Sequence, residues 1–256
     1  MGYLYETHLH TCLSSACGVS TGKEHVRFYK AQGYTGIIMT DHFFRGNTAV
    51  SRDRPWEERV DLFWRGYEDA LEEGLKVGLD VFFAYEENHV HDEYLIYGLT
   101  RDYMKAHPEM EHWTRREQLE AVHAAGGAVI QAHPFRVRNY IDIIRVGDLF
   151  ADGIEAANAG NAQLDDARAY AFGKEKGLLM TAGSDNHHSP MAQPFGVELE
   201  EKLTSVQDYA NLLRRGGPVG LHVPEGRFAV PDGAERLPAW RLDEKETLHS
   251  MQEPWL

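Results

Sequence analysis

Short apolar runs alternate with helical patterns along most of this 256-residue chain. The apolar runs predict strands at 3–10, 36–42, 80–87, 93–99, 127–134, 152–158 and 177–185, with a short eighth strand at 218–221. Apolar residues spaced by three and four predict helices at 21–33, 56–77, 114–125 and 163–176 and from Ser205 onward. Thr21 and Glu24 have the spacing of a capping box. Repeated strand–helix order is typical of parallel strands covered by helices. We therefore expect an α/β barrel domain over residues 1–221.

The C-terminal part, 222–256, has four prolines and little periodicity. We expect it to form a tail that packs on the barrel, with Trp240 and Trp255 as anchors.

Composition narrows the classes of function. With 43% hydrophobic and 26% charged residues, the chain has the balance of a soluble globular protein. It contains no run of 18 apolar residues and does not begin with a signal-peptide pattern, so we expect no membrane span or export. Two cysteines argue against a disulfide framework, and a cytoplasmic location is expected. A net charge of −14 disfavours stable binding of a nucleic-acid duplex, whereas small anionic substrates stay compatible because bound cations reverse the local field. The oligomeric state is not set by the sequence.

Potential metal ligands stand where the predicted strands end. They are His8, His10, Asp41, His42, Glu86, Glu87, His133, Asp185 and His187. Each pair taken alone is more typical of a surface or core position. In parallel α/β architectures, however, the carboxyl ends of the strands meet on the face that carries the active site. Imidazole and carboxylate groups bind Zn²⁺, Mn²⁺ or Fe²⁺, so the joint placement predicts a metal site.

The order of these residues resembles that of the PHP family, named for polymerase and histidinol phosphatase. The matching motifs are His-x-His (His8, His10), Thr-Asp-His (Thr40, Asp41, His42), a metal-bridging Glu (Glu86 in "FAYEEN"), His-Pro (His133 in "AHPFR") and Asp-x-His (Asp185, His187). The match runs from residue 4 to about residue 220. The resemblance implies a distorted (β/α)7 TIM-like barrel with two or three metal ions at the carboxyl ends of the strands. It also implies hydrolysis of phosphoesters.

Two positions depart from the family pattern. Cys17 stands in the loop after the first strand, where the family usually has Asp or His. A thiolate binds zinc or iron well, so Cys17 either replaces that ligand or is simply a small buried residue. Leu95 in "YLIYGL" lies near the place of a further histidine.

Four histidines are alternatives for that missing ligand: His89, His91, His107 and His112. One to three divalent ions are therefore expected.

The resemblance and the ligand set together predict a metal-dependent phosphoesterase. Its substrate would be a small phosphorylated metabolite or a short nucleotide, attacked by a hydroxide formed on the metal. Glu86 would bridge two ions. The first ion would also bind His8, His10 and Asp185, the second would bind His133, and a third would bind His42 and His187.

Other residues are predicted to act on the substrate. Arg136, three residues after His133, has a guanidinium suited to paired hydrogen bonds with phosphate. Arg45 is a weaker phosphate-binding candidate. Asn158 and Asn161 either reach substrate hydroxyls or form a turn.

Asp41 either orients a ligand or proton, or caps the strand end, and His188 either acts as a general acid or faces solvent.

Two other functions stay open. The ligand set also resembles that of amidohydrolases, which cleave carbon-centred bonds. The second alternative is a metal-binding module without catalytic activity.

Overall fold

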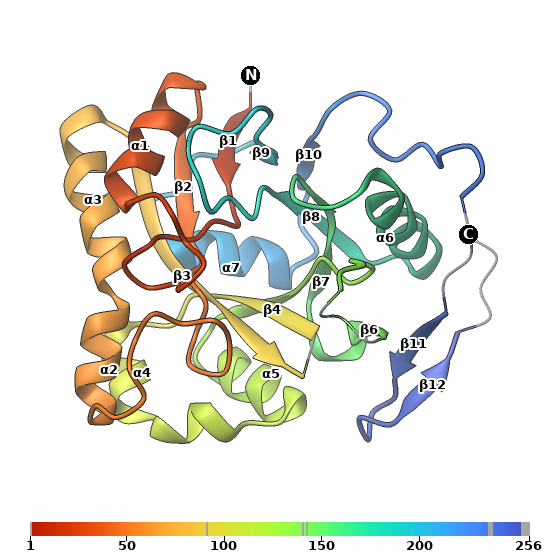
Figure 1. Cartoon of the computed structure of the whole chain (residues 1–256), viewed down its shortest axis with the longest axis horizontal. Helices are drawn as coiled ribbons and strands as arrows, with labels where there is room; N and C mark the ends of the chain where they lie inside the picture. The colour runs from red at the N-terminus through yellow and green to blue at the C-terminus, as the bar shows by residue number, and fades with distance from the viewer. Residues whose placement is uncertain (1, 91, 140, 142, 235–237, 252–256) are drawn as a thin grey trace.

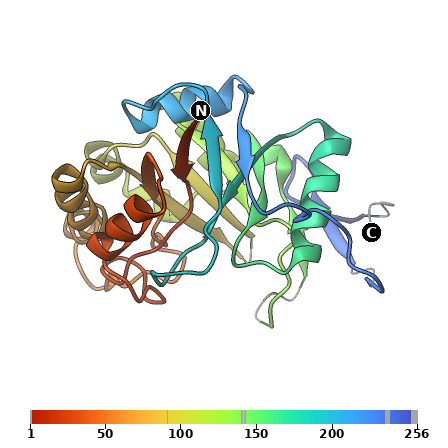
Figure 2. The same cartoon turned by 90° about the horizontal axis from the view of Figure 1, so that it is seen from above.

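The computed structural model describes residues 2–90, 92–139, 141, 143–234 and 238–251. Its main feature is a nine-stranded sheet that curls into a nearly closed barrel (Figures 1 and 2), in the order β10-β9-β1-β2-β3-β4-β5-β7-β8. Its strands are β1 (Tyr3–Glu6), β2 (Gly36–Met39), β3 (Asp80–His89), β4 (Asp92–Tyr97), β5 (Ala128–Ala132), β7 (Gly153–Asn158), β8 (Leu179–Gly183), β9 (Gly196–Leu199) and β10 (Gly220–His222). A smaller sheet joins β6 (Ile144–Val146), β11 (Ala239–Leu242) and β12 (Leu248–Ser250).

The barrel closes where the ends of β1 and β8 meet. Leu9 and Asn186 form a parallel bridge just beyond these strands, and the His10 amide donates to the Asn186 carbonyl at 2.9 Å. The Thr7 hydroxyl donates to the Ala182 carbonyl at 3.0 Å across the same seam. The carboxyl ends of β1 and β8 are therefore joined directly. The predicted distorted (β/α)7 TIM-like barrel is confirmed.

The expectation that the strands are all parallel was wrong. Strand β4 runs antiparallel to both β3 and β5, and β9 and β10 are also antiparallel to their neighbours. Only two residues separate β3 from β4, and a parallel return requires a crossover of a dozen residues or more. The first residues of β4 consequently lie at the rim where β3 ends.

The helices largely follow the apolar periodicity. They are α1 (Gly22–Ala31), α2 (Trp56–Phe63), α3 (Arg65–Val77), α4 (Arg101–Ala106), α5 (Arg115–Ala124), α6 (Gln163–Lys176) and α7 (Val206–Arg214), with 3₁₀ turns at Pro108–His112 and Asp148–Phe150. The capping box at Thr21 and Glu24 is confirmed, because each side chain accepts a hydrogen bond from the backbone amide of the other residue.

Three local predictions need correction. The helix predicted over 56–77 is interrupted at Trp64, which separates α2 from α3. The segment 100–113, for which neither a helix nor a strand was predicted, contains α4 and the 3₁₀ turn Pro108–His112, and the Thr100 hydroxyl caps α4 by accepting a hydrogen bond from the Tyr103 amide. The first strand ends at Glu6, so His8 and His10 lie just beyond it.

Helix α7 lies across the end of the barrel at which most strands begin (Figure 2). Its Tyr209, Ala210 and Leu213 are buried in one apolar cluster with Tyr5 of β1 and Tyr97 of β4. The rings of Tyr97 and Tyr209 meet edge to face at 5.0 Å. Apolar side chains therefore fill the barrel interior beneath α7.

The C-terminal part contributes strands as well as loops, although little regular structure was expected there. β11 pairs in parallel with β6 and antiparallel with β12, and Arg241 forms an ion pair with Asp148 at 2.6 Å. Trp240 lies on β11, whereas Trp255 is outside the described residues. The domain boundary at 221 stays a prediction. In the part of the chain that the structure describes, no helix is both long and apolar enough to cross a membrane.

Candidate metal centre

The carboxylate of Glu86, on β3, is surrounded by four imidazoles. Its Oε1 lies 3.3 Å from Nε2 of both His8 and His133. Its Oε2 lies 2.7 Å from Nδ1 of His42 and 3.6 Å from Nε2 of His10. All five side chains are almost completely buried. Three separate segments of the chain thus converge on one carboxylate of a fourth.

Asp185, two residues after β8, completes one side of this cluster. Its Oδ1 lies 3.0 Å from His10 Nε2 and 3.5 Å from His8 Nε2, and the two histidine nitrogens are 3.1 Å apart. Burial by itself would raise the pKa of Asp185, but Arg136, His8 and His10 hold it well below its usual range. Burial opposes ionisation of Glu86 too, and His8 and His42 lower its pKa well below the ordinary value. Both carboxylates are therefore ionised and able to bind a cation.

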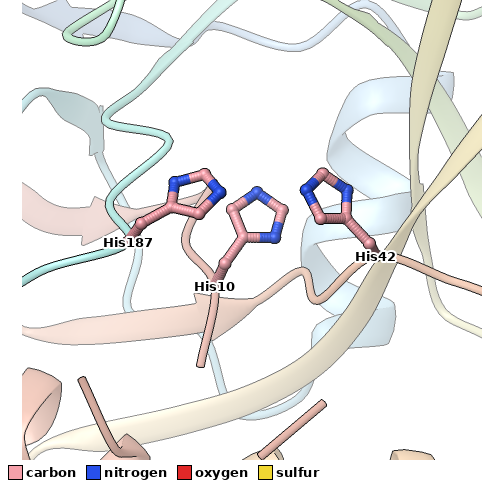
Figure 3. Close-up of side chains that lie close together, drawn as sticks. All are labelled: His10, His42 and His187. Atoms are coloured by element: carbon pink, nitrogen blue, oxygen red, sulfur yellow. The ribbon is translucent and has the colours of Figure 1, made fainter. Parts of the chain in front are cut away.

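His10, His42 and His187 form a second group of donors, and Figure 3 shows the ring of His10 between the other two. The His10 ring stacks at 4.2 Å on that of His42 and at 4.4 Å on that of His187. The half-buried Cys17 thiol lies beside the imidazoles of His187 and His42 and lines the same cavity. Burial raises the pKa of this thiol, but the two imidazoles outweigh burial and lower it to about 6. Cys17 consequently lies at the site with thiolate character.

Glu93, which the sequence reasoning missed, supplies a carboxylate on the other side of Glu86. Its Oε2 lies 3.4 Å from His133 Nε2, and with His42 and Glu86 it forms a further group of close donors. Leu95 is fully buried in the apolar core, directly opposite Glu86 in the strand pairing. Two residues apart on one strand, Glu93 and Leu95 share a face of β4. Because β4 is antiparallel, its first residues reach the site.

The alternative histidines are placed differently. His89 is hydrogen-bonded to Arg45 and to Gln118, and His107 pairs with Glu109 at the surface. Neither these two nor His112 joins a donor group among the described residues. His91 lies outside the described part of the chain.

Glu155, on β7, is a second carboxylate that the sequence reasoning missed. Its Oε1 lies 2.9 Å from His8 Nδ1, and its Oε2 accepts from the His133 amide at 3.1 Å and from the Asn158 amide group at 2.9 Å. A carboxylate only accepts, so Nδ1 of His8 donates its hydrogen to Glu155, and Nε2 faces Glu86, where it would bind a cation once it has lost its own hydrogen. Glu155 thus fixes the orientation of the His8 ring. A charged residue within the apolar run "GIEAAN" was the available signal.

Asp41 does not point into the cluster. Its Oδ1 accepts from the Thr11 amide and the Ser15 hydroxyl, both at 2.6 Å, and its Oδ2 accepts from the Thr11 hydroxyl at 2.9 Å. The Ser15 hydroxyl in turn accepts from the His42 amide at 2.9 Å. Asp41 therefore fixes the loop between His10 and Ser15, a role closer to the predicted orienting function than to contact with a substrate.

A cavity of about 570 Å³ opens over the cluster. Its lining residues include Cys17, His42, Arg45, Glu86, Glu93, His133, Arg136, Asp185 and His187. Arg136 is 7% exposed, its Nη2 lies 2.6 Å from Asp185 Oδ2, and its Nε donates to Asn161 Oδ1 at 2.6 Å. The cavity wall therefore combines ionised carboxylates, imidazoles and one buried guanidinium.

Three other predicted site residues are less well placed for contact with a substrate. The guanidinium of Arg45 lines the cavity but is bonded to the Trp113 carbonyl and His89. Asn158 is fully buried and uses its side chain on Glu155 and the Gly160 amide. His188 is exposed, and the described residues that line the cavity do not include it.

The arrangement fits divalent cations. His42 Nδ1 and Glu86 Oε2 are both buried and lie 2.7 Å apart, yet neither has a well-oriented hydrogen bond. Four groups of three donors have their ligand atoms within 4.8 Å of one another. His133 and Asp185 also adopt left-handed backbone angles, with φ of 29° and 52°, a strained state that clusters at functional sites. Imidazoles and carboxylates at these separations are the donor set of Zn²⁺, Mn²⁺ or Fe²⁺.

No family model and no curated protein matches this sequence. Solved structures do match. A candidate metal-dependent phosphoesterase from Bifidobacterium adolescentis is 16% identical, with a TM-score of 0.51 over 82% of this chain and 96% of that one. A two-domain protein from Bacteroides vulgatus with a PHP-like metal-dependent phosphoesterase is 16% identical, with a TM-score of 0.59 over 87% of this chain. This chain has a PHP-like fold.

The match covers 65% of the length of the Bacteroides protein. PsfC from Pseudomonas syringae shares the fold along nearly its whole length, with 14% identity, a TM-score of 0.57 and coverage of 89% of this chain and 94% of that one. The predicted resemblance to the PHP family is thus confirmed at the level of the fold.

Proposed function

We propose that this protein is a metal-dependent hydrolase that cleaves phosphoric esters of small metabolites or short nucleotides. The observation that carries the proposal is the Glu86 carboxylate, enclosed by four imidazoles, at the base of a cavity that Arg136 also lines. The two structural neighbours named as phosphoesterases share the fold and support the same class of reaction.

The residues present can hold one to three ions. His8, His10 and Asp185 would hold the first ion together with Glu86, which would be shared with a second ion at His133 and Glu93. His42 and His187, with Cys17, would hold a third. Such ions supply positive charge that polarises a phosphoryl group and lowers the pKa of water.

Arg136 would bind the phosphoryl group of the substrate. A guanidinium is planar, permanently charged and able to donate two parallel hydrogen bonds to phosphoryl oxygens. Its place beside Asp185 puts that charge at the edge of the ion cluster. The position of Arg136 therefore favours a phosphorylated substrate over an uncharged amide.

Phosphate release from a substrate panel tests this function. The purified protein, loaded with Mn²⁺ or Zn²⁺, would be offered phosphomonoesters, dinucleotides and a parallel set of amides and lactones, with Asp185→Asn as the inactive control. We expect metal-dependent release of phosphate from the monoesters, or cleavage of the dinucleotides to mononucleotide and nucleoside followed by chromatography, and the control should show neither. Cleavage of the amides or lactones alone would support the amidohydrolase reading. Bound metal without turnover of any substrate would support a non-catalytic module.

A further inference from the structure

Arg227, in the C-terminal part of the chain, is inserted into the loop that follows β7. Its Nε donates to Asp166 Oδ2 at 2.7 Å. Its Nη2 donates to the carbonyls of Asn158 and Asn161 at 3.1 and 2.9 Å. The side chain is only 15% exposed. One guanidinium therefore connects the tail, the loop and the first turn of α6.

Asp166 connects Arg227 to Asn161 through its two carboxylate oxygens. It is completely buried, and its Oδ1 accepts from Asn161 Nδ2 at 2.8 Å while its Oδ2 also accepts from the Asn158 amide at 3.0 Å. Because a carboxylate has no hydrogen to donate, the amide nitrogen of Asn161 must face Asp166. The Asn161 oxygen is thereby turned toward the opposite side.

That oxygen meets Arg136. Asn161 Oδ1 accepts from Arg136 Nε at 2.6 Å, and Arg136 Nη2 lies 2.6 Å from Asp185 at the cavity. Since a guanidinium is planar, the contact of Nε with Asn161 and that of Nη2 with Asp185 together set the plane of the whole group. A continuous series of polar contacts consequently runs from the tail to the cavity wall.

We propose that Arg227 is a positioning residue that holds the Arg136 guanidinium, through Asp166 and Asn161, in the plane in which it receives phosphoryl oxygens. The proposal rests on the proposed function for the role of Arg136. It adds that the C-terminal part of the chain belongs to the anion-binding site. Without Arg227 the buried Asp166 carboxylate loses the guanidinium that pairs with it. The loop after β7 also loses the donor that binds the carbonyls of Asn158 and Asn161. Asn161 is then free to turn away from Arg136.

Binding of inorganic phosphate to the Mn²⁺-loaded protein measures this directly by titration calorimetry. We expect Arg227→Gln and Asn161→Ala each to weaken phosphate binding about three- to tenfold, and to raise KM more than they lower kcat. The double variant should bind phosphate no more weakly than Asn161→Ala, because both changes break the same series of contacts. Arg227→Lys, which keeps a cation near Asp166, is a milder variant and should lie between wild type and Arg227→Gln.

The matched control is Arg241→Gln. Arg241 is also a tail arginine paired with a carboxylate, at 2.7 and 2.6 Å from the Asp148 oxygens, but Asp148 lies on the 3₁₀ turn before β7 and not on the loop that follows β7. It should leave phosphate affinity at the wild-type value. Equal losses in Arg241→Gln and Arg227→Gln would overturn the proposal, since the tail would then act only by general stabilisation.

Two further outcomes separate the proposal from the proposed function. If Arg136→Gln and Asn161→Ala weaken phosphate binding while Arg227→Gln and Arg227→Lys do not, the positioning role is wrong and the phosphate-binding role of Arg136 stands. If Arg136→Gln leaves phosphate affinity unchanged, both the positioning role and the phosphate-binding role are wrong.

Discussion

Replacing Glu155 by glutamine tests whether the imidazole of His8 is held in the orientation that metal binding requires. Three donors converge on the Glu155 carboxylate: His8 Nδ1, the His133 amide and the Asn158 amide group. Glutamine has the same shape but only one acceptor oxygen. If that oxygen faces His8, the new amide group confronts two buried donors. If the amide group faces His8 instead, the hydrogen of the imidazole moves to Nε2, which then cannot bind a cation.

Either arrangement should weaken metal binding, and the size of the loss can be estimated. Leaving a buried donor without a partner costs about 1–3 kcal/mol. Loss of a carboxylate that orients a metal-bound histidine weakens metal affinity by about 10- to 100-fold. That range corresponds to about 1.4–2.8 kcal/mol, which agrees with the cost of the unpaired donor. We therefore expect Glu155→Gln to bind Mn²⁺ about 10- to 100-fold more weakly than wild type.

Competition with a chromophoric chelator measures this affinity. Asp152→Asn is the matched control, because Asp152 also accepts from a histidine ring (His123, 2.9 Å) and from a backbone amide (Val129, 2.9 Å), but near the opposite end of the barrel. The control should keep wild-type metal affinity. Unchanged affinity in Glu155→Gln, or an equal loss in Asp152→Asn, would refute the reasoning.

Three other predictions follow from the same geometry. Glu93→Gln should lower the number of ions retained per chain, measured by mass spectrometry of the metals, because it removes one carboxylate from the His133 side; an unchanged metal content would contradict a ligand role. Removing divalent ions with a chelator should lower Tm and readdition should restore it, because ions that bind only the folded state stabilise it; equal Tm values would argue against a bound ion. Burial raises the pKa of Asp166 from 3.8 to about 6, although Arg227 and Asn161 oppose this. The folded state therefore holds that proton more tightly, and the free energy of unfolding should fall by about 2 kcal/mol as the pH rises from 4 to 6. Urea unfolding should show a smaller fall in Asp166→Asn, and equal slopes would contradict the raised pKa.

The sequence allowed most of the candidate metal ligands to be predicted, because each lies within a few residues of the end of an apolar run. His8 and His10, Asp185 and His187, and His133 stand where the chain leaves the sheet, and the barrel brings those places together. The apolar runs also located β2, β3, β5, β7 and β8 to within a few residues. Helix α6 was predicted with its exact bounds because Gly177 ends it in the left-handed conformation.

Strand direction could not be read in this way. The run containing Glu93 was recognised as a strand, but an apolar pattern does not say which end of a strand lies at the site. The short connection between β3 and β4 reverses the chain, so the beginning of β4, rather than its end, supplies Glu93. Glu155 was missed for a different reason. It acts from inside the barrel wall on His8, and no local pattern indicates such a long-range partner.

The central claim is that side chains far apart in the sequence are gathered to bind cations, and anomalous diffraction from crystals grown with Mn²⁺ tests it most directly. Collected on either side of the manganese absorption edge, the data should place at least one ion within coordination distance of Glu86, His8 and Asp185. A well-ordered structure with manganese only at surface carboxylates, and none near Glu86, would contradict the account.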